Sequence, residues 1–247
     1  MLDGKKNPEC VERICFDRWI AWGALAGVFL LALAVRLTDW YFDPVIERDG
    51  VFYLEMIRNW PDIQSPPLFP AIVWRLSQLG ADVYSGAVGV NMVCGALLPV
   101  IFWQMLRWYG CGYRLAFAGS LLVCFCPPLV NLSHSVLRDS LYLLACAVFM
   151  AGCIKLWFGK GTGAWLIGAA MMMAGFIRYE AFELLLLLPV ILIGAIRHHR
   201  MKWSGGLVWA GQICAGMMIS LIGCLCVVGA GWQSYRDWFR VIMLRFL

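Results

Sequence analysis

Residues 39–70 read DWYFDPVIERDGVFYLEMIRNWPDIQSPPLFP and separate two long apolar runs. The segment contains six carboxylates and two arginines: Asp39, Asp43, Glu47, Asp49, Glu55 and Asp62, with Arg48 and Arg58. A polar loop between membrane spans, on the side poor in Lys and Arg, is expected to face away from the cytoplasm. The sequence therefore predicts an extracytoplasmic acidic loop over residues 39–82.

The composition predicts an all-α, multi-pass membrane protein. Of 247 residues, 62% are hydrophobic and only 14% are charged. This is too little polar surface for a water-soluble globule, whereas a bilayer requires such a balance. The net charge of +5 is spread over short loops and forms no basic patch, so we expect no nucleic-acid partner. His and Cys do not gather with carboxylates at ligand spacing, so neither a metal nor another cofactor is expected.

Several apolar runs have the length of about 20 residues that crosses a bilayer. The expected spans are Trp19–Thr38, Val83–Leu106, Tyr113–Leu132, Ser135–Trp157 and Gly205–Ala230. We expect Pro127 and Pro128 to break the end of the third span. Pro66–Leu79 is shorter and contains Arg75, so it is expected to lie at the membrane interface.

The segment Gly163–Ile196 is too long for one crossing. Its roughly 34 residues would form a helix about 50 Å long, and a single crossing would place the basic cluster at residues 197–202 outside. A break at Arg178–Glu180 gives two short spans and returns the cluster to the cytoplasm. The sequence thus predicts seven crossings with the N-terminus inside.

This topology divides the chain into three parts in an inner or plasma membrane. Residues 1–18 are expected to be a cytoplasmic tail, and residues 19–231 a membrane domain that includes the acidic loop. Residues 232–247 are expected to be an extracytoplasmic segment. The active face would be extracytoplasmic.

Three motifs resemble a known family. RDGVFYLEMIRNW, followed by SPPLFP and a long span ending in basic residues and glycine, resembles the start of the GT-C glycosyltransferases that use polyprenyl-phosphate sugars. The resemblance is to the protein O-mannosyltransferases and lipid A aminoarabinose transferases. SVLRDSLYLL resembles the family's acidic residue at the start of a span, and FIRYEAFELLLLLP its Arg-containing turn.

The resemblance implies transfer of a sugar from a polyprenyl phosphate to an extracytoplasmic lipid, glycan or protein, with Asp49 as general base. The alternative for Asp49 is an N-cap of a helix from Gly50 to Asn59. Tyr53, one turn later, would either orient this carboxylate or anchor the interface. Such a reaction also needs cations to hold the leaving phosphate.

Arg178 is the first candidate phosphate ligand, and Arg138 and Arg36 are weaker ones. The alternative for each is an arginine that snorkels to the headgroups. Glu180 is expected to neutralise Arg178. Asp139 is either a second active-site carboxylate or the intrahelical partner of Arg138.

Two further interpretations concern residues expected on the extracytoplasmic side. We expect Glu55 and Arg58 to form a solvated pair, and His134 to be structural.

Two departures from the family pattern qualify these expectations. Gln64 and Ser65 stand where the aminoarabinose transferases have Glu and Lys, which argues against that acceptor. Family members are usually longer and have a soluble C-terminal domain. The chain is therefore interpreted either as an active enzyme or as a fragment of a larger protein, whose activity would then need the missing part. The alternative functions are a non-catalytic membrane subunit and a transporter or flippase of cell-envelope glycans.

Overall fold

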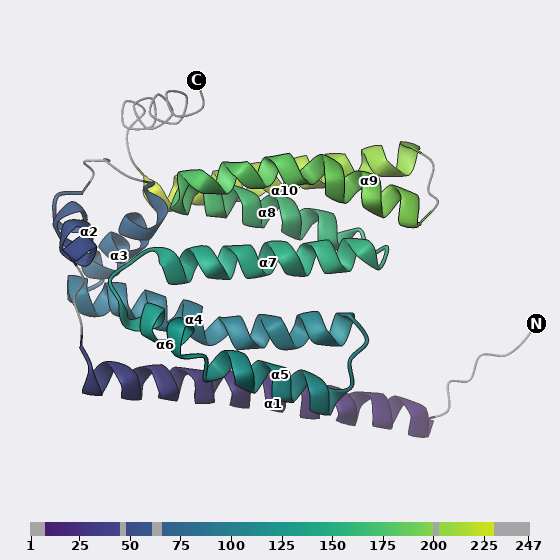
Figure 1. Ribbon diagram of the computed structural model, residues 1–247, viewed down its shortest axis with the longest axis horizontal. Coiled ribbons are helices and arrows are strands. Elements are labelled where there is room, and N and C mark those ends of the chain that lie inside the picture. Colours follow the sequence, from purple (N-terminus) through teal and green to yellow (C-terminus); the bar gives the residue numbers. More distant parts are fainter. Residues whose placement is uncertain (1–7, 45–47, 61–65, 200–202, 230–247) are drawn as a thin grey trace, which may run out of the picture.

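The structure is a computed structural model that describes residues 8–44, 48–60, 66–199 and 203–229. In these ranges it contains helices and no β-strand. The longer helices lie along the long axis of the molecule, and two short ones lie across one end (Figure 1). Their bounds are α1 Pro8–Phe42, α2 Arg48–Arg58, α3 Leu68–Gln78, α4 Val83–Trp108, α5 Tyr113–Cys124, α6 Pro127–His134, α7 Asp139–Trp157, α8 Thr162–Ile177, the 3₁₀ helix η1 Tyr179–Leu187, α9 Leu188–His198 and α10 Trp203–Val228.

Five helical segments of the described chain are long and apolar enough to cross a membrane. They are Ala21–Phe42, Val83–Trp108, Asp139–Trp157, Tyr179–His198 and Ser204–Val228. A sixth is added if α5 and α6, which are bent by 54° relative to each other, count as one broken span. α8 has 16 residues and falls short of the length of a span. These helices support an integral membrane protein, with five or six candidate spans where the sequence predicted seven.

The two ends of the bundle differ in charge. α2 and α3 lie at one end, which we call the loop end, beside the first residues of α4 and α7 (Figure 1). The opposite end, where α1 begins, has basic residues in or beside the helix connections, and we call it the basic end. Its cations include Arg107, Arg114, Lys155, Lys160 and Arg197.

The predicted break near Arg178 is confirmed. α8 ends at Ile177, Arg178 is extended with φ −144° and ψ 135°, and η1 begins at Tyr179. The chain then turns back along α8 toward the basic end (Figure 1). A 3₁₀ helix of nine residues is unusually long, because such helices rarely exceed 3–4 residues. The break leaves Arg178 at the loop end.

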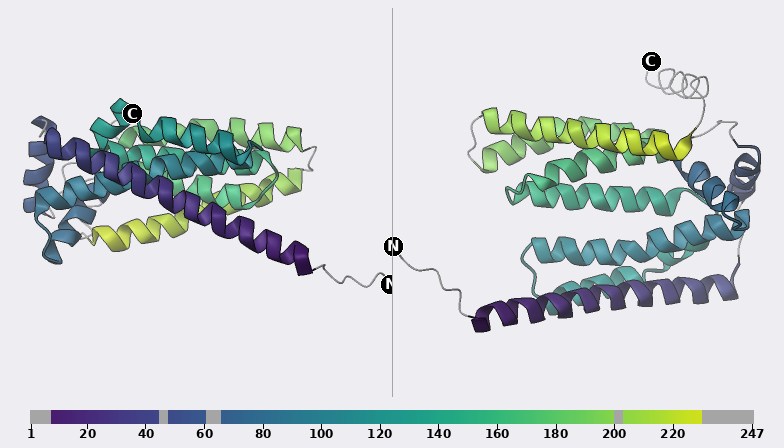
Figure 2. Two further views of the ribbon diagram at one scale, coloured as in Figure 1. Left: turned by 90° about the horizontal axis from the view of Figure 1, so that it is seen from below. Right: turned by 180° about the vertical axis from the view of Figure 1, so that it is seen from behind.

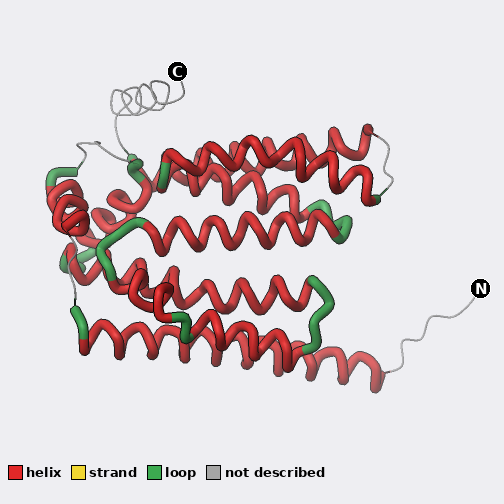
Figure 3. The backbone as a smooth tube through the Cα atoms, in the orientation of Figure 1, coloured by secondary structure: helices red, strands yellow, loops and turns green. Residues whose placement is uncertain are grey.

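The predicted break at Pro127 and Pro128 is confirmed: α5 ends at Cys124, and α6 is bent by 54° relative to it. Pro127 starts α6, because proline fits the first turn of a helix, where no N–H is needed. Two predicted boundaries are corrected. α1 begins at Pro8, so part of the expected tail is helical, and its apolar span runs on to Phe42. Residues 135–138 form an irregular link before α7 (Figure 3). The expected segment 232–247 lies outside the described residues.

Buried side chains join the loop end to the bundle. On α2, Tyr53, Met56 and Ile57 recur at helical spacing and are buried, while α3 buries Leu68 and Phe69. These residues belong to one apolar cluster that also includes residues of α4, α7, α8 and α10. α3 has 11 residues, too few to cross a bilayer. α1 crosses the other helices at an angle (Figure 2).

Candidate functional site

The candidate site lies at the loop end, where α2 meets the start of α7 and the break after α8. The six residues singled out from the sequence come from three separate segments. They are Asp49 and Tyr53 on α2, Arg138 and Asp139 at the start of α7, and Arg178 and Glu180 at the break. Contacts and electrostatic interactions connect all six, as described below.

Asp49 is an exposed carboxylate in the first turn of α2. The alternative interpretation, an N-cap of a helix starting at Gly50, is wrong, because α2 already begins at Arg48. A carboxylate in the first turn is still favoured by the helix dipole. Since Asp49 is exposed, its oxygens are open to a ligand approaching from the loop side.

Tyr53 is the residue around which the site is assembled. Its side chain is buried, so the interfacial-anchor interpretation is wrong. Its ring packs edge-to-face on Phe69, with centroids 6.1 Å apart, and the guanidinium of Arg138 lies 5.7 Å from the ring centroid. Asp49, Asp139 and Arg178 also act electrostatically on the phenol.

The protonation state of Tyr53 follows from this environment. Burial raises the pKa of the Tyr53 phenol above its usual value, and the positive charge of Arg138 partly offsets that rise. The phenol is therefore protonated at neutral pH. It can donate a hydrogen bond to an anion or to a carboxylate.

Arg178 is held by two carboxylates. Its Nη1 donates to Oδ1 of Asp139 at 2.5 Å, and its Nε lies 3.5 Å from Oε2 of Glu180. The expected neutralisation by Glu180 is confirmed. The interpretation of Asp139 as the partner of Arg138 is wrong, because Asp139 pairs with Arg178 across the two segments. The guanidinium also lies 5.4 Å from the ring centroid of Tyr142.

Arg138 has a hydrogen-bond donor without a partner among the described residues. Its Nη1 is buried and has no hydrogen-bond partner in the part of the chain that the structure describes. An unpaired buried donor is costly unless a ligand or water satisfies it. Arg138 also acts electrostatically on Glu180. Because Arg178 is already paired twice, Arg138 is the better placed of the two to bind an added anion, which reverses the order inferred from sequence.

Asn91 of α4 fixes the link that carries Arg138, and the sequence interpretation missed it. The Asn91 side chain is fully buried, and its Nδ2 donates to the carbonyl oxygens of Ser135 at 2.7 Å and Leu137 at 2.6 Å. These carbonyls belong to the irregular link and lack helical partners. A lone Asn inside an apolar span was the available signal, since polar residues there are seldom without a role.

Arg36 and His134 form a separate polar cluster between α1 and α6. Arg36 is fully buried, donating from Nε to Oγ of Ser133 and from Nη1 to the carbonyl of Ala32, both at 3.0 Å, so the snorkelling interpretation is wrong. His134 Nε2 lies 2.8 Å from Oδ2 of Asp39, which joins the end of α6 to α1 and supports a structural role.

Two further observations concern the Glu55–Arg58 pair and groups of metal-ligating side chains. In the described chain, no ion pair joins Glu55 to Arg58. The searched residues also contain no group of three His, Cys, Asp or Glu side chains with the arrangement of a metal site.

The site thus combines an exposed carboxylate, a protonated phenol, a cation paired with two carboxylates, and a cation with a free buried donor. Such a set can accept a proton at Asp49 while holding an anion at Arg138 and Tyr53. Comparisons with family models, curated proteins and solved structures found no match to this chain.

Proposed function

We propose that the protein is a glycosyltransferase that moves a sugar from a polyprenyl phosphate to an acceptor on the extracytoplasmic side. The observation that carries the proposal is the convergence of Asp49, Tyr53 and Arg138 at the loop end. The motif resemblance singles out Asp49, and the free Nη1 of Arg138 supplies an unused donor for an anion.

The charge distribution supports the orientation. Arg107, Lys155 and Arg197 lie at the basic end, and the positive-inside rule favours a cytoplasmic position for that end. The loop end, with the candidate site, then faces the opposite side. The membrane would be an inner or plasma membrane, as expected from the sequence.

In the proposed reaction, an acceptor hydroxyl oxygen attacks the anomeric carbon of the donor sugar. The bond between that carbon and the phosphate oxygen breaks, and the oxygen keeps the electron pair. The acceptor proton passes to the Asp49 carboxylate and then to water. The phosphate gains one negative charge in this step, and Arg138 and Tyr53 are placed to stabilise it by hydrogen bonds.

The experiment tests Asp49 as the general base with a substitution that keeps the size of its side chain. Vesicles containing the protein would receive undecaprenyl phosphate carrying radiolabelled mannose, glucose or aminoarabinose in turn, and transfer to membrane acceptors would be followed. Asp49→Asn keeps the size of the side chain but cannot take a proton, so transfer should fall roughly 10²–10⁴-fold while undecaprenyl phosphate still binds.

Glu55→Gln, in the same helix and also exposed, is the matched control and should transfer normally. Normal turnover by the Asp49→Asn protein, expressed at wild-type level, would remove the general base from the proposal.

One observation favours a second candidate function. The 54° bend between α5 and α6 lies beside the buried Arg36, and broken spans with buried charge are typical of transporters. A flippase would move a fluorescent lipid-linked sugar across proteoliposomes without cleaving it. Translocation that persists in Asp49→Asn would favour transport over transfer.

A further inference from the structure

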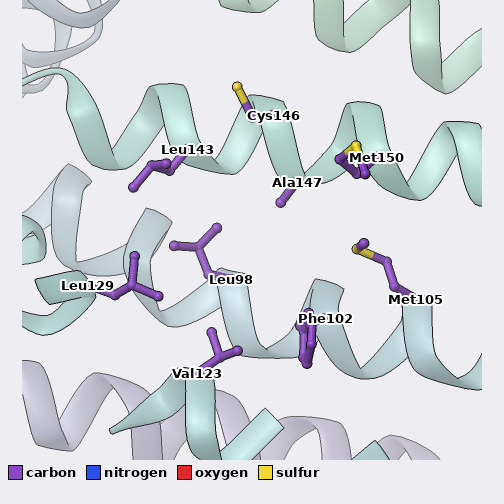
Figure 4. A pocket seen from close by; sticks show the side chains of 9 residues that line it. All are labelled: Leu98, Phe102, Met105, Val123, Leu129, Leu143, Cys146, Ala147 and Met150. Atoms are coloured by element: carbon purple, nitrogen blue, oxygen red, sulfur yellow. The ribbon is translucent and has the colours of Figure 1, made fainter. Parts of the chain in front are cut away.

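An apolar pocket lies between α4 and α7, beside the α5–α6 break. Its volume is about 300 Å³, at the lower end of the range of ligand pockets, roughly 300–1,000 Å³. No charged residue lines it. Figure 4 shows Leu98 from α4, Leu129 from α6, and Leu143 and Ala147 from α7 directed toward the space between these helices.

The pocket and the candidate site share one side of α7. Asp139, Leu143, Ala147 and Met150 follow one another at spacings of four, four and three residues, which places them along one face of the helix. At 1.5 Å per residue, Leu143 lies about 6 Å and Met150 about 16 Å along the axis from Asp139. The pocket therefore starts about one helical turn below the polar site.

The lining residues are apolar and follow the axis of α7. The pocket extends along α7 over about two turns, from Leu143 to Met150, and Met105 faces Met150 near its far end (Figure 4). Methionine side chains are flexible and polarisable and adapt to irregular apolar ligands. The 300 Å³ volume suits one segment of a hydrocarbon chain.

We propose that this pocket binds the hydrocarbon chain of the same lipid phosphate whose headgroup lies at Arg138, and that Met105 and Met150 set how far the bound segment extends. The proposal rests on the proposed function, because the lipid is its donor. Only a hydrocarbon chain long enough to reach past Leu143 contacts the side chains that line the pocket. Affinity should therefore depend on chain length in this protein.

The test compares two probes with the same phosphate. Undecaprenyl phosphate has a chain that passes the pocket, whereas isopentenyl phosphate has a five-carbon chain too short to fill it. Ala147→Phe fills the pocket and should weaken undecaprenyl phosphate binding roughly tenfold or more, because the chain loses its packing contacts with the pocket lining. Isopentenyl phosphate should bind as it does to the wild type.

Ala118→Phe, the same substitution at an exposed position of α5, is the control and should change neither affinity. Unchanged undecaprenyl phosphate binding by a folded Ala147→Phe protein would overturn the pocket proposal. If Arg138→Gln left the affinities of both probes unchanged, the headgroup site and with it the proposed function would fail instead.

A second measurement needs no substitution. Undecaprenyl phosphate with a diazirine in its chain should crosslink wild-type protein within residues 98–105 or 143–150. Crosslinks confined to α1 or α10 would contradict the proposal. Equal crosslinking of these residues by a diazirine-bearing phosphatidylcholine would show a general lipid contact and would also overturn it.

Discussion

The hydrogen bonds of Asn91 give a prediction that the structure makes quantitative. Both partners of its side chain are carbonyl oxygens, so only the NH₂ group can face them. Two such bonds contribute about 1–3 kcal/mol together. The Oδ1 atom of Asn91 is buried without a partner in the described chain, and removing this unsatisfied acceptor should stabilise the folded protein by roughly 1 kcal/mol. Asn91→Leu should therefore lower the free energy of unfolding by about 0–2 kcal/mol.

Asn91→Asp should be worse, because it places acceptor oxygens against two carbonyls. An uncompensated buried charge costs about 3–5 kcal/mol. Unfolding in mixed micelles with increasing SDS measures both variants, and Asn131→Asp, at an exposed position of α6, is the control, expected within about 0.5 kcal/mol of wild type. If Asn91→Asp were as stable as Asn91→Leu, the two hydrogen bonds and the fixed position of the link would be refuted.

Three other predictions concern charge and packing. Arg138→Gln should raise the pKa of the Tyr53 phenol further, since it removes the positive charge that opposes the effect of burial. Ultraviolet titration, with the Tyr53→Phe protein as reference, measures this pKa. An unchanged or lower pKa would contradict the contact between Arg138 and Tyr53. Gly95→Ala should destabilise the protein by about 1–3 kcal/mol, because the added Cβ would meet the buried Arg36–Ser133 hydrogen bond, whereas Gly89→Ala, with open space around it, should not. The backbone N–H of Ser85 donates to the Asp82 carboxylate and lowers its pKa. The carboxylate therefore stabilises the folded protein at pH values above the pKa that Asp82 has in the unfolded chain, and this stabilisation is lost as the pH falls through its pKa in the folded protein. In thermal unfolding, the Asp82→Asn protein should lose less stability than wild type on going to acid pH.

Sequence reasoning placed the break at Arg178 because two physical limits agreed. One helix over Gly163–Ile196 would exceed a bilayer, and a single crossing would misplace the basic cluster that follows. Arg178 and Glu180 were close in sequence, so their pairing needed no long-range information. The membrane class followed from composition alone.

The contacts between segments could not be predicted in the same way. Periodicity gives helix lengths and faces, but it does not say which residue faces Arg138 or which carboxylate pairs with Arg178. Asp139 could bond either arginine until the break brought Arg178 beside it. The two prolines at 127–128 fit both the end of one helix and the start of another, and packing decides between these.

The number of spans depends on how α8 is counted. Thr162–Ile177 has 16 residues, fewer than the five candidate spans, although it runs from the basic end to the break at the loop end (Figure 1). Burial of its small residues, such as Gly168 against the backbone of Ile213, shows how closely it packs on α10.

The central claim is tested most directly by equilibrium binding of undecaprenyl phosphate to the detergent-solubilised protein and its Arg138→Gln variant. A charged hydrogen bond of about 1.5–3 kcal/mol predicts that the Kd rises roughly 10- to 150-fold on substitution. Arg58→Gln, an exposed arginine of α2, should leave the Kd unchanged. Equal affinities for wild type and Arg138→Gln would contradict an anion site at Arg138 and the lipid-phosphate donor with it.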